Sequence, residues 1–313
     1  MLRHIGRRLL LAIPTLLAVF TIIFIIVRVA PGDPAVAALG DYASADAVAA
    51  LRERMGLNAP LWQQYLTFLG DLARGDLGES LISRKPVSEQ IAFVLPYTLE
   101  LTAASILVGL FLGVPTGVIT AIRRNTPTDY VGRVFSLLGL SFPAFYLGIL
   151  LMFFFAVKLD LFPAVGSAPF SEPGRNLHYL VLPALTLGLI ETAYIARMTR
   201  SVMLTILSDD YIRTARAKGL REWIVLVQHA LRAALIPIVS LVGIFAISLI
   251  GSSVLVEEVF ARPGLGKLMV GATKQKDYTT LQSIMVVYAL IIVVINLITD
   301  IVYTYVDPRV RYD

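Results

Sequence analysis

Few residues of this 313-residue chain have the types and spacing that catalysis requires. It has no cysteine and only three scattered histidines, His4, His178 and His229, so the pattern predicts neither thiol chemistry nor a metal site. No nucleophile can be matched with a base and an orienting acid. Gly266-Lys267-Leu268 comes nearest to a phosphate-binding loop, but Leu268 stands where that motif needs Ser or Thr. We therefore expect no catalytic residue, metal or cofactor in this chain.

Three acidic residues instead lie in or at the ends of long apolar stretches: Glu100, Glu191 and Asp300. A charge at the centre of a membrane costs roughly 2.5–3.5 kcal/mol on insertion scales, and such residues often mark an ion or solute pathway. Glu191 is the deepest, so we predict that it faces a watery pathway or a partner cation. Glu100 and Asp300 are nearer the ends of their stretches and are expected to reach the interface.

The elements that position these residues are predicted to be membrane spans. Hydrophobic residues make up 57% of the chain and charged residues 16%, against about 45–50% and about 25% in soluble domains, and the mean hydropathy is +0.76. Six segments have about the 20 apolar residues that cross a bilayer: 9–29, 97–122, 133–157, 179–200, 233–257 and 279–304. We predict an all-α, polytopic transmembrane helix bundle forming one domain over residues 1–313, and not a soluble globule. Segment 9–29 is longer than the apolar core of a signal peptide and is expected to be retained.

Basic residues predict how these spans are oriented. With the N-terminus inside, 15 of the 27 Lys and Arg residues fall in cytoplasmic segments and six in the two short outer loops. The positive-inside rule therefore places both termini in the cytoplasm. Residues 31–95 form a long outer loop, for which helical periodicity at 46–55 and 61–72 predicts a small helical domain. Residues 201–232 form the largest cytoplasmic loop. Because the basic residues gather on one side of the predicted spans, the positive net charge favours a membrane over a nucleic-acid partner.

Small and cyclic residues predict how the spans pack. Gly109, Gly113 and Gly117 recur every four residues, a spacing that lets two helices approach closely, either inside the bundle or at a dimer interface. Pro14, Pro115, Pro143 and Pro183 are expected to kink their spans.

The loop 201–232 has a pattern of its own. Ser208 or Asp209 can cap a helix, residues 211–218 make two turns, and Gly219 can end them with a positive φ angle. A second amphipathic stretch is predicted to follow, with an apolar stripe formed by Leu220, Ile224, Val227, Leu231 and Leu235.

The order of residues in this loop resembles the cytoplasmic coupling loop of permease subunits from ATP-binding-cassette importers. The general family pattern has Glu-Ala-Ala before the glycine, where this chain has Arg213-Thr214-Ala215 before Gly219. The sequence YIRTARAKG (211–219), followed by HALR (229–232), is similar instead to the dipeptide and oligopeptide subfamily, which also includes nickel, glutathione and opine importers. PGDP (31–34), SFPAF (141–145), ARMTRS (196–201), ARPGLGKL (261–268) and DPRVRY (307–312) extend the resemblance over the whole chain.

The resemblance implies a multi-pass permease of a bacterial inner membrane that imports short peptides or similar small solutes. It implies four kinds of partner: a homologous second permease giving a heterodimeric pore, two ATPase subunits that hold ATP and Mg²⁺, an extracytoplasmic substrate-binding protein, and lipid. Coupling to the ATPases is assigned by resemblance to Asp210, Tyr211, Ile212, Arg213, Thr214, Ala215, Arg216, Ala217, Lys218 and Gly219. The alternative is a secondary transporter driven by an ion or proton gradient through Glu191 and Asp300.

Overall fold

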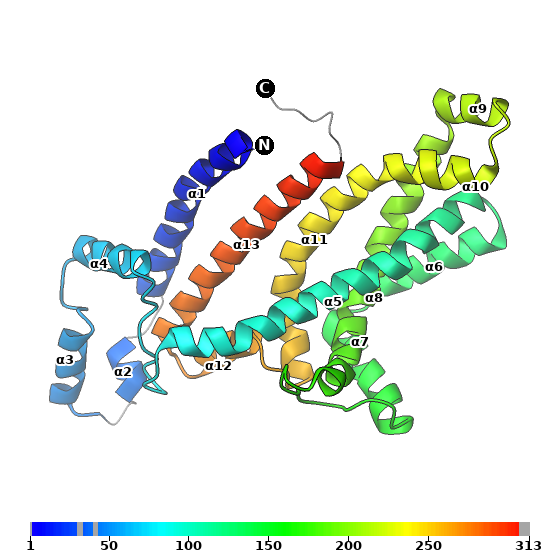
Figure 1. The fold of residues 1–313 in the computed structure, drawn as a ribbon. Helices are drawn as coiled ribbons and strands as arrows, with labels where there is room; N and C mark the ends of the chain where they lie inside the picture. Colours follow the sequence, from blue (N-terminus) through cyan, green and yellow to red (C-terminus); the bar gives the residue numbers. More distant parts are fainter. Residues whose placement is uncertain (1, 30–33, 40–42, 307–313) are drawn as a thin grey trace. The chain divides into compact units, whose positions relative to one another are not determined.

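The computed structural model describes residues 2–29, 34–39 and 43–306. Within these residues the regular structure is helical (Figure 1), apart from an isolated antiparallel bridge between Glu79 and Pro86. Most of the PGDP motif and the DPRVRY motif lie outside the described residues. The chain divides into two compact units, one formed by residues 1–96 and 264–294 and the other by residues 97–263 and 295–313.

The first unit contains the segment predicted as an outer loop. Its helices are α1 (Leu2–Val29), α2 (Pro34–Leu39), α3 (Ala45–Arg54), α4 (Leu61–Ala73), the start of α5 (Val87–Ile122), α12 (Leu265–Lys274) and most of α13 (Tyr278–Val306). The predicted helices at 46–55 and 61–72 are thus present as α3 and α4. The Ser44 hydroxyl accepts a hydrogen bond from the Ala47 N–H at the start of α3. After α4 the chain turns at Gly75, whose φ angle is +78°.

A small core holds the ends of this unit's spans together. Val87 and Ile91 of α5 pack with Leu265 of α12 and Ile284 of α13. The Asp277 carboxylate, just before α13, accepts hydrogen bonds from the hydroxyls of Ser80 at 2.6 Å and Thr280 at 2.7 Å.

The second unit is built around one long helix, α8 (Pro173–Leu207). Its other elements are most of α5, α6 (Pro127–Ser141), α7 (Ala144–Leu151), the π-helix η1 (Met152–Lys158), α9 (Asp210–Ala217), α10 (Glu222–Ile224), the π-helix η2 (Val225–Leu231), α11 (Arg232–Val259) and the end of α13. Helices α6, α7 and α11 all pack against α8 (Figure 1). The largest apolar cluster of the second unit includes Leu101, Leu182, Leu187, Leu249 and Phe260.

The glycine stripe of α5 lies against α8. A Cβ atom at Gly109 would come within 2.8 Å of the Glu191 Cβ atom, and one at Gly117 within 2.5 Å of the Thr199 Cβ atom. These distances are shorter than real Cβ contacts allow, so glycine is what lets the two backbones approach. Of the two predicted roles, the stripe therefore serves packing inside the chain.

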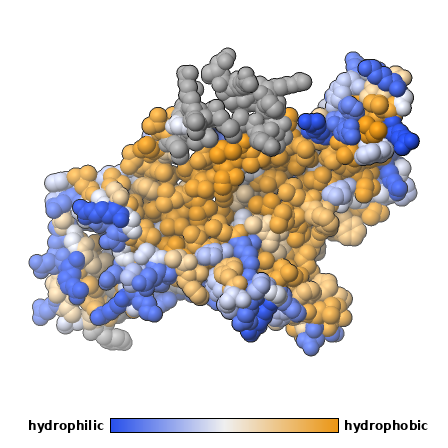
Figure 2. All heavy atoms as spheres, viewed as in Figure 1, coloured by the Kyte–Doolittle hydropathy of each residue, from blue (hydrophilic) through white to orange (hydrophobic). Residues whose placement is uncertain are grey.

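Among the described residues, five helices are long and apolar enough to cross a membrane, and the bent pair at 127–158 adds a sixth if its two halves are one span. Residues 133–157 were predicted as one span kinked at Pro143, and the break lies there, but it is much sharper than a kink. The chain bends by 106° between α6 and α7, because Pro143 cannot donate the hydrogen bond that would continue α6 and restricts Phe142 to an extended conformation. Apolar side chains cover most of the surface seen in Figure 2.

Two other boundaries differ from those predicted. Helix α5 starts at Val87, ten residues before the predicted span, and it continues through Pro96. The stripe predicted after Gly219 was also wrong. The buried residues there include Val225, Ala230 and Ala234, whereas Val227 is exposed, because the π-helix η2 turns more slowly than the α-helix assumed in the prediction.

Candidate functional site

The segment 201–232, here called the α9 segment, contains a short helix that stands apart from the spans. Helix α8 ends at Leu207, and Asp209 takes the extended conformation of an N-cap residue, although its side chain makes no capping hydrogen bond in the structure. Helix α9 covers Asp210–Ala217, so the two turns predicted there are present.

Helix α9 is fixed to the spans by one face only. Ile212 and Ala215 are buried, and they pack in a cluster with Met203 of α8, Val225 of η2 and Ala234 of α11. The remaining predicted site residues are all exposed: Asp210, Tyr211, Arg213, Thr214, Arg216, Ala217, Lys218 and Gly219. Figure 2 shows the region of α9 and α10 as largely hydrophilic. Eight of the ten predicted residues therefore form the exposed surface of α9 and of the turn that follows it.

A tight turn closes the α9 segment. Gly219 has a φ angle of +77°, and its N–H donates to the Arg216 carbonyl oxygen at 2.9 Å. Across the turn, Arg216 Nη2 donates to Glu222 Oε1 at 2.7 Å. This hydrogen bond is the main cause of a lowered pKa for Glu222. The part of the Tyr211 side chain that is shielded from water raises the pKa of its hydroxyl, with a smaller contribution from the negative charge of Asp209.

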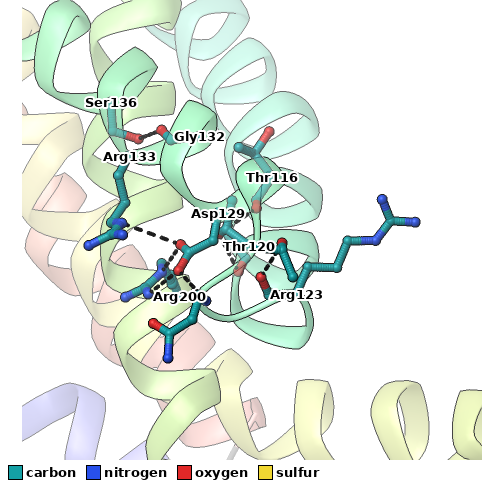
Figure 3. A network of polar contacts seen from close by, with 11 residues as sticks. Thr116, Thr120, Arg123, Asp129, Gly132, Arg133, Ser136 and Arg200 are labelled. Carbon is teal, nitrogen blue, oxygen red and sulfur yellow. Dashed lines mark hydrogen bonds and ion pairs between the residues drawn. The ribbon is translucent and has the colours of Figure 1, made fainter.

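A buried ion cluster holds α8 just before the α9 segment (Figure 3). Arg200 of α8 donates to both carboxylate oxygens of Asp129 on α6, from Nε at 2.7 Å and from Nη2 at 2.8 Å. Arg133 Nε lies 3.5 Å from the same carboxylate, and the Asn125 N–H donates to it at 3.0 Å. Asp129 is fully buried. The cluster therefore ties the turn between α5 and α6 to α8, seven residues before α8 ends.

The acids predicted at membrane depth have different surroundings. Glu191 is 6% exposed, and its Oε2 atom has no hydrogen-bond partner among the described residues. Glu100 instead accepts a hydrogen bond from Asn176 Nδ2 at 2.5 Å and pairs with Arg262. Asp300 is half-buried on α13. Glu191 lies 19 positions before Asp210, or roughly 28 Å along a helix, so it is not part of the α9 site.

Sequence reasoning missed several buried charges, among them Asp129 and Arg262. Asp129 went unnoticed because Arg133 and Arg200 were read only as markers of the cytoplasmic side. An acid in the first turn of a helix, flanked by Arg123, Arg124 and Arg133, is the signal that could have identified it. Arg262 was counted as an outer-loop charge, yet it is fully buried beside Glu100, with its guanidinium 5.3 Å from the centroid of the Tyr97 ring.

Family models match the chain along nearly its whole length. Residues 113–312 match the model described as "Binding-protein-dependent transport system inner membrane component". Residues 1–102 match the model for the N-terminal part of such membrane components.

Curated relatives align over the full length of both chains. The chain is 40% identical to the dipeptide transport system permease protein DppB of Alkalihalophilus pseudofirmus, with 100% of each chain covered. It is 42% identical to the glutathione transport system permease protein GsiC of Pectobacterium atrosepticum, again with 100% coverage of each.

Solved structures with a similar fold are more distant in sequence. A chain of the MetNI methionine ABC transporter, in an inward-facing conformation, matches with a TM-score of 0.58 and 21% identity, covering 70% of this chain and 96% of that one. A chain of an amino acid ABC transporter with histidines matches with a TM-score of 0.52 and 15% identity, covering 70% and 94%.

Proposed function

Because the chain belongs to the family of binding-protein-dependent transport system inner membrane components, and so is a pore-forming permease subunit of an ABC-type importer, we propose that α9 is where partner ATPases drive it. The observation that carries this proposal is the combination of a short exposed helix with a rigid base. Ile212 and Ala215 anchor α9 in the core between α8, η2 and α11. A push on its exposed face would therefore move three elements of the bundle together.

The chemistry of ATP hydrolysis belongs to the partners in this proposal. Two ATPase subunits hold ATP and Mg²⁺, and their closure biases the permease between outward-open and inward-open states. Neither ATP nor Mg²⁺ is assigned to residues of this chain. A homologous second permease completes the pore, and a substrate-binding protein delivers the solute on the opposite side of the membrane.

The proposed substrate is a short peptide. Permeases that transport a dipeptide and glutathione, itself a tripeptide, are each about 40% identical to this chain. The chemistry common to both ligands is a flexible chain with amide bonds and a free carboxylate, which is the class we assign to this importer.

The coupling role is tested at Gly219. We expect Gly219→Val to abolish substrate-stimulated ATPase activity of the assembled importer while the chain still inserts, because a β-branched residue resists the φ angle of +77°. Gly219→Asn is the matched control, since asparagine tolerates a left-handed backbone, and it should keep most of the stimulation. No atom lies within 4 Å of a Cβ built there, so a steric effect inside the chain is not expected. Full coupling in Gly219→Val would refute the assignment.

We also propose six spans with both termini in the cytoplasm, residues 31–95 outside and the α9 segment inside, in a bacterial inner membrane. Because the chain has no cysteine, single cysteines report sidedness without background. Ala43→Cys should react with an impermeant thiol reagent in intact cells, and Ser208→Cys only after permeabilisation. The reverse order would overturn this topology and the contact between α9 and cytoplasmic ATPases.

A second candidate function, a secondary transporter, rests on one observation. The Glu191 carboxyl is buried, and its Oε2 atom has no hydrogen-bond partner among the described residues. In a secondary transporter this group would bind the coupling ion, and Glu191→Gln would abolish gradient-driven uptake. In the importer, Glu191→Gln should lower ATP-driven uptake only moderately. Uptake by reconstituted vesicles, with ATP or with an imposed proton gradient, distinguishes the two. Gradient-driven uptake without ATP in the unmodified chain would reject the importer proposal.

A further inference from the structure

Helix α4 carries large apolar side chains that point away from the protein. The exposed fractions are 63% for Leu61, 66% for Trp62 and 58% for Leu66. Such residues rarely lie together in water on a 13-residue helix. Their exposure therefore raises the question of what covers them.

The side of α4 that faces the protein is already occupied. Tyr65 and Phe68 place their rings 5.3 Å and 5.8 Å from the ring of Phe24 on α1, measured between centroids. The Tyr65 hydroxyl also hydrogen-bonds the Thr21 hydroxyl at 2.6 Å. These contacts fix how α4 is rotated about its axis, with Tyr65 and Phe68 toward α1.

The rotation gives α4 three different sides. At 100° per residue, Trp62 and Leu66 form an apolar side next to the one that contacts α1. Gln63 and Thr67 follow on a third side, which is exposed and polar. A helix with one protein-facing, one apolar and one polar side is suited to the boundary between a membrane and water.

Its position along α1 places α4 at such a boundary. Residues 10–29 of α1 are a candidate span, and α4 contacts α1 at Thr21 and Phe24, close to the end of that span. Ile22, Ile25 and Ile26 of α1 are each at least half exposed at the same level, and an apolar surface on a spanning helix meets lipid. Arg28, one turn further, donates from Nε to Gln64 Oε1 at 2.8 Å, as expected of a basic residue at a membrane surface.

We propose that α4 lies in the membrane surface at which α1 ends, with Trp62 and Leu66 inserted at the boundary between lipid headgroups and acyl chains. The apolar surface of α1 continues onto α4 through the contacts of Phe24, so a single lipid surface covers both. Tryptophan is the residue type most typical of this depth. The proposed role is to anchor the 31–95 segment to the bilayer. It requires that α1 spans the membrane and does not depend on the coupling role of α9.

The test uses single cysteines in the full chain, which has no native cysteine. Trp62→Cys and Leu66→Cys probe the apolar side, and Gln63→Cys and Thr67→Cys are matched controls on the polar side of the same helix. Each is labelled with bimane and reconstituted, alone and with cysteine-free partner subunits, in vesicles of phosphatidylcholine brominated near the headgroup end of its acyl chains. We expect at least twofold stronger quenching by bromolipid at positions 62 and 66, and the opposite order with aqueous iodide.

Two results would overturn the proposal. Equal access of iodide to all four positions would show that α4 is surrounded by water. Absence of bromolipid quenching, together with loss of iodide access at positions 62 and 66 only when the substrate-binding protein is added, would assign this side to protein docking. Either result could occur in an importer whose Gly219 variants behave as proposed. Failure of the α4 proposal is therefore distinguishable from failure of the coupling proposal.

Discussion

The two ends of α8 are each held by a buried ion cluster, but the charges are reversed. At the end that leads to α9, an acid lies at the centre, because Asp129 is paired with Arg200 and Arg133. At the other end a base lies at the centre, because Arg262 is paired with Glu100 and influenced by the charge of Glu257. Both central residues are fully buried.

The two clusters also differ in how completely they are hydrogen-bonded. Both oxygens of the Asp129 carboxylate accept hydrogen bonds from Arg200, and the Asn125 N–H adds a third. In contrast, Nε and Nη1 of Arg262 have no hydrogen-bond partner within the described part of the chain. A guanidinium keeps its charge at any physiological pH, whereas a carboxylate can be neutralised by a proton. The cluster centred on Asp129 therefore tolerates loss of its centre less well, and it is the one beside α9.

The largest effect is expected for Asp129→Asn. The change leaves two arginine charges close together with no counter-ion, and removing one partner of a buried pair costs about 3–5 kcal/mol. We expect a lower temperature of thermal unfolding for the purified importer, together with weaker coupling between substrate and ATPase activity. Asp129→Asn combined with Arg200→Met is the control, since it also removes the stranded charge and should recover part of the loss. A stability equal to that of the unmodified chain would show that the pair is not structural.

A smaller effect is expected for Arg262→Met. The carboxyls left behind are able to take up a proton, so the cost should fall to about 1–3 kcal/mol, as for buried polar groups that lose a partner. The unfolding temperature of the same importer measures this loss of stability. Adding Glu100→Gln should restore stability in part by removing one of the two acids. If Arg262→Met proves more damaging than Asp129→Asn, the comparison drawn above is wrong.

The smallest effect is expected for Glu222→Gln, which tests an exposed ion pair against the two buried ones. Arg216 and Glu222 are both well exposed, and such pairs contribute about 0–1 kcal/mol. Because Arg216 lowers the pKa of Glu222 from its ordinary value of 4.5, the stabilisation is present above pH 4.5 and is lost as the pH falls through the lowered pKa. The difference in unfolding temperature between Glu222→Gln and the unmodified chain should be small at pH 7 and vanish once the pH falls well below the lowered pKa. A difference that grows on acidification would contradict this account.

The sequence by itself determined the elements whose signals are local. Long uncharged segments require helices in a membrane, and Gly219 after two helical turns marked the end of α9, where its φ angle is positive. The spacing of Tyr65, Phe68 and Leu72 likewise predicted α4, since a side chain recurs on one face every three or four residues. The order of residues from Tyr211 to Gly219 was enough to indicate the family.

Only the tertiary structure decided which charges meet. Asp129 and Arg200 are 71 positions apart, and Glu100 and Arg262 are 162 apart, so no periodicity within a helix links them. The same is true of the bend at Pro143, where a proline that could have produced a mild kink allows a 106° turn. Packing against α8 determines such features, because it selects among conformations that the local sequence leaves nearly equal in energy, and a lone charge is buried only where the fold supplies its partner.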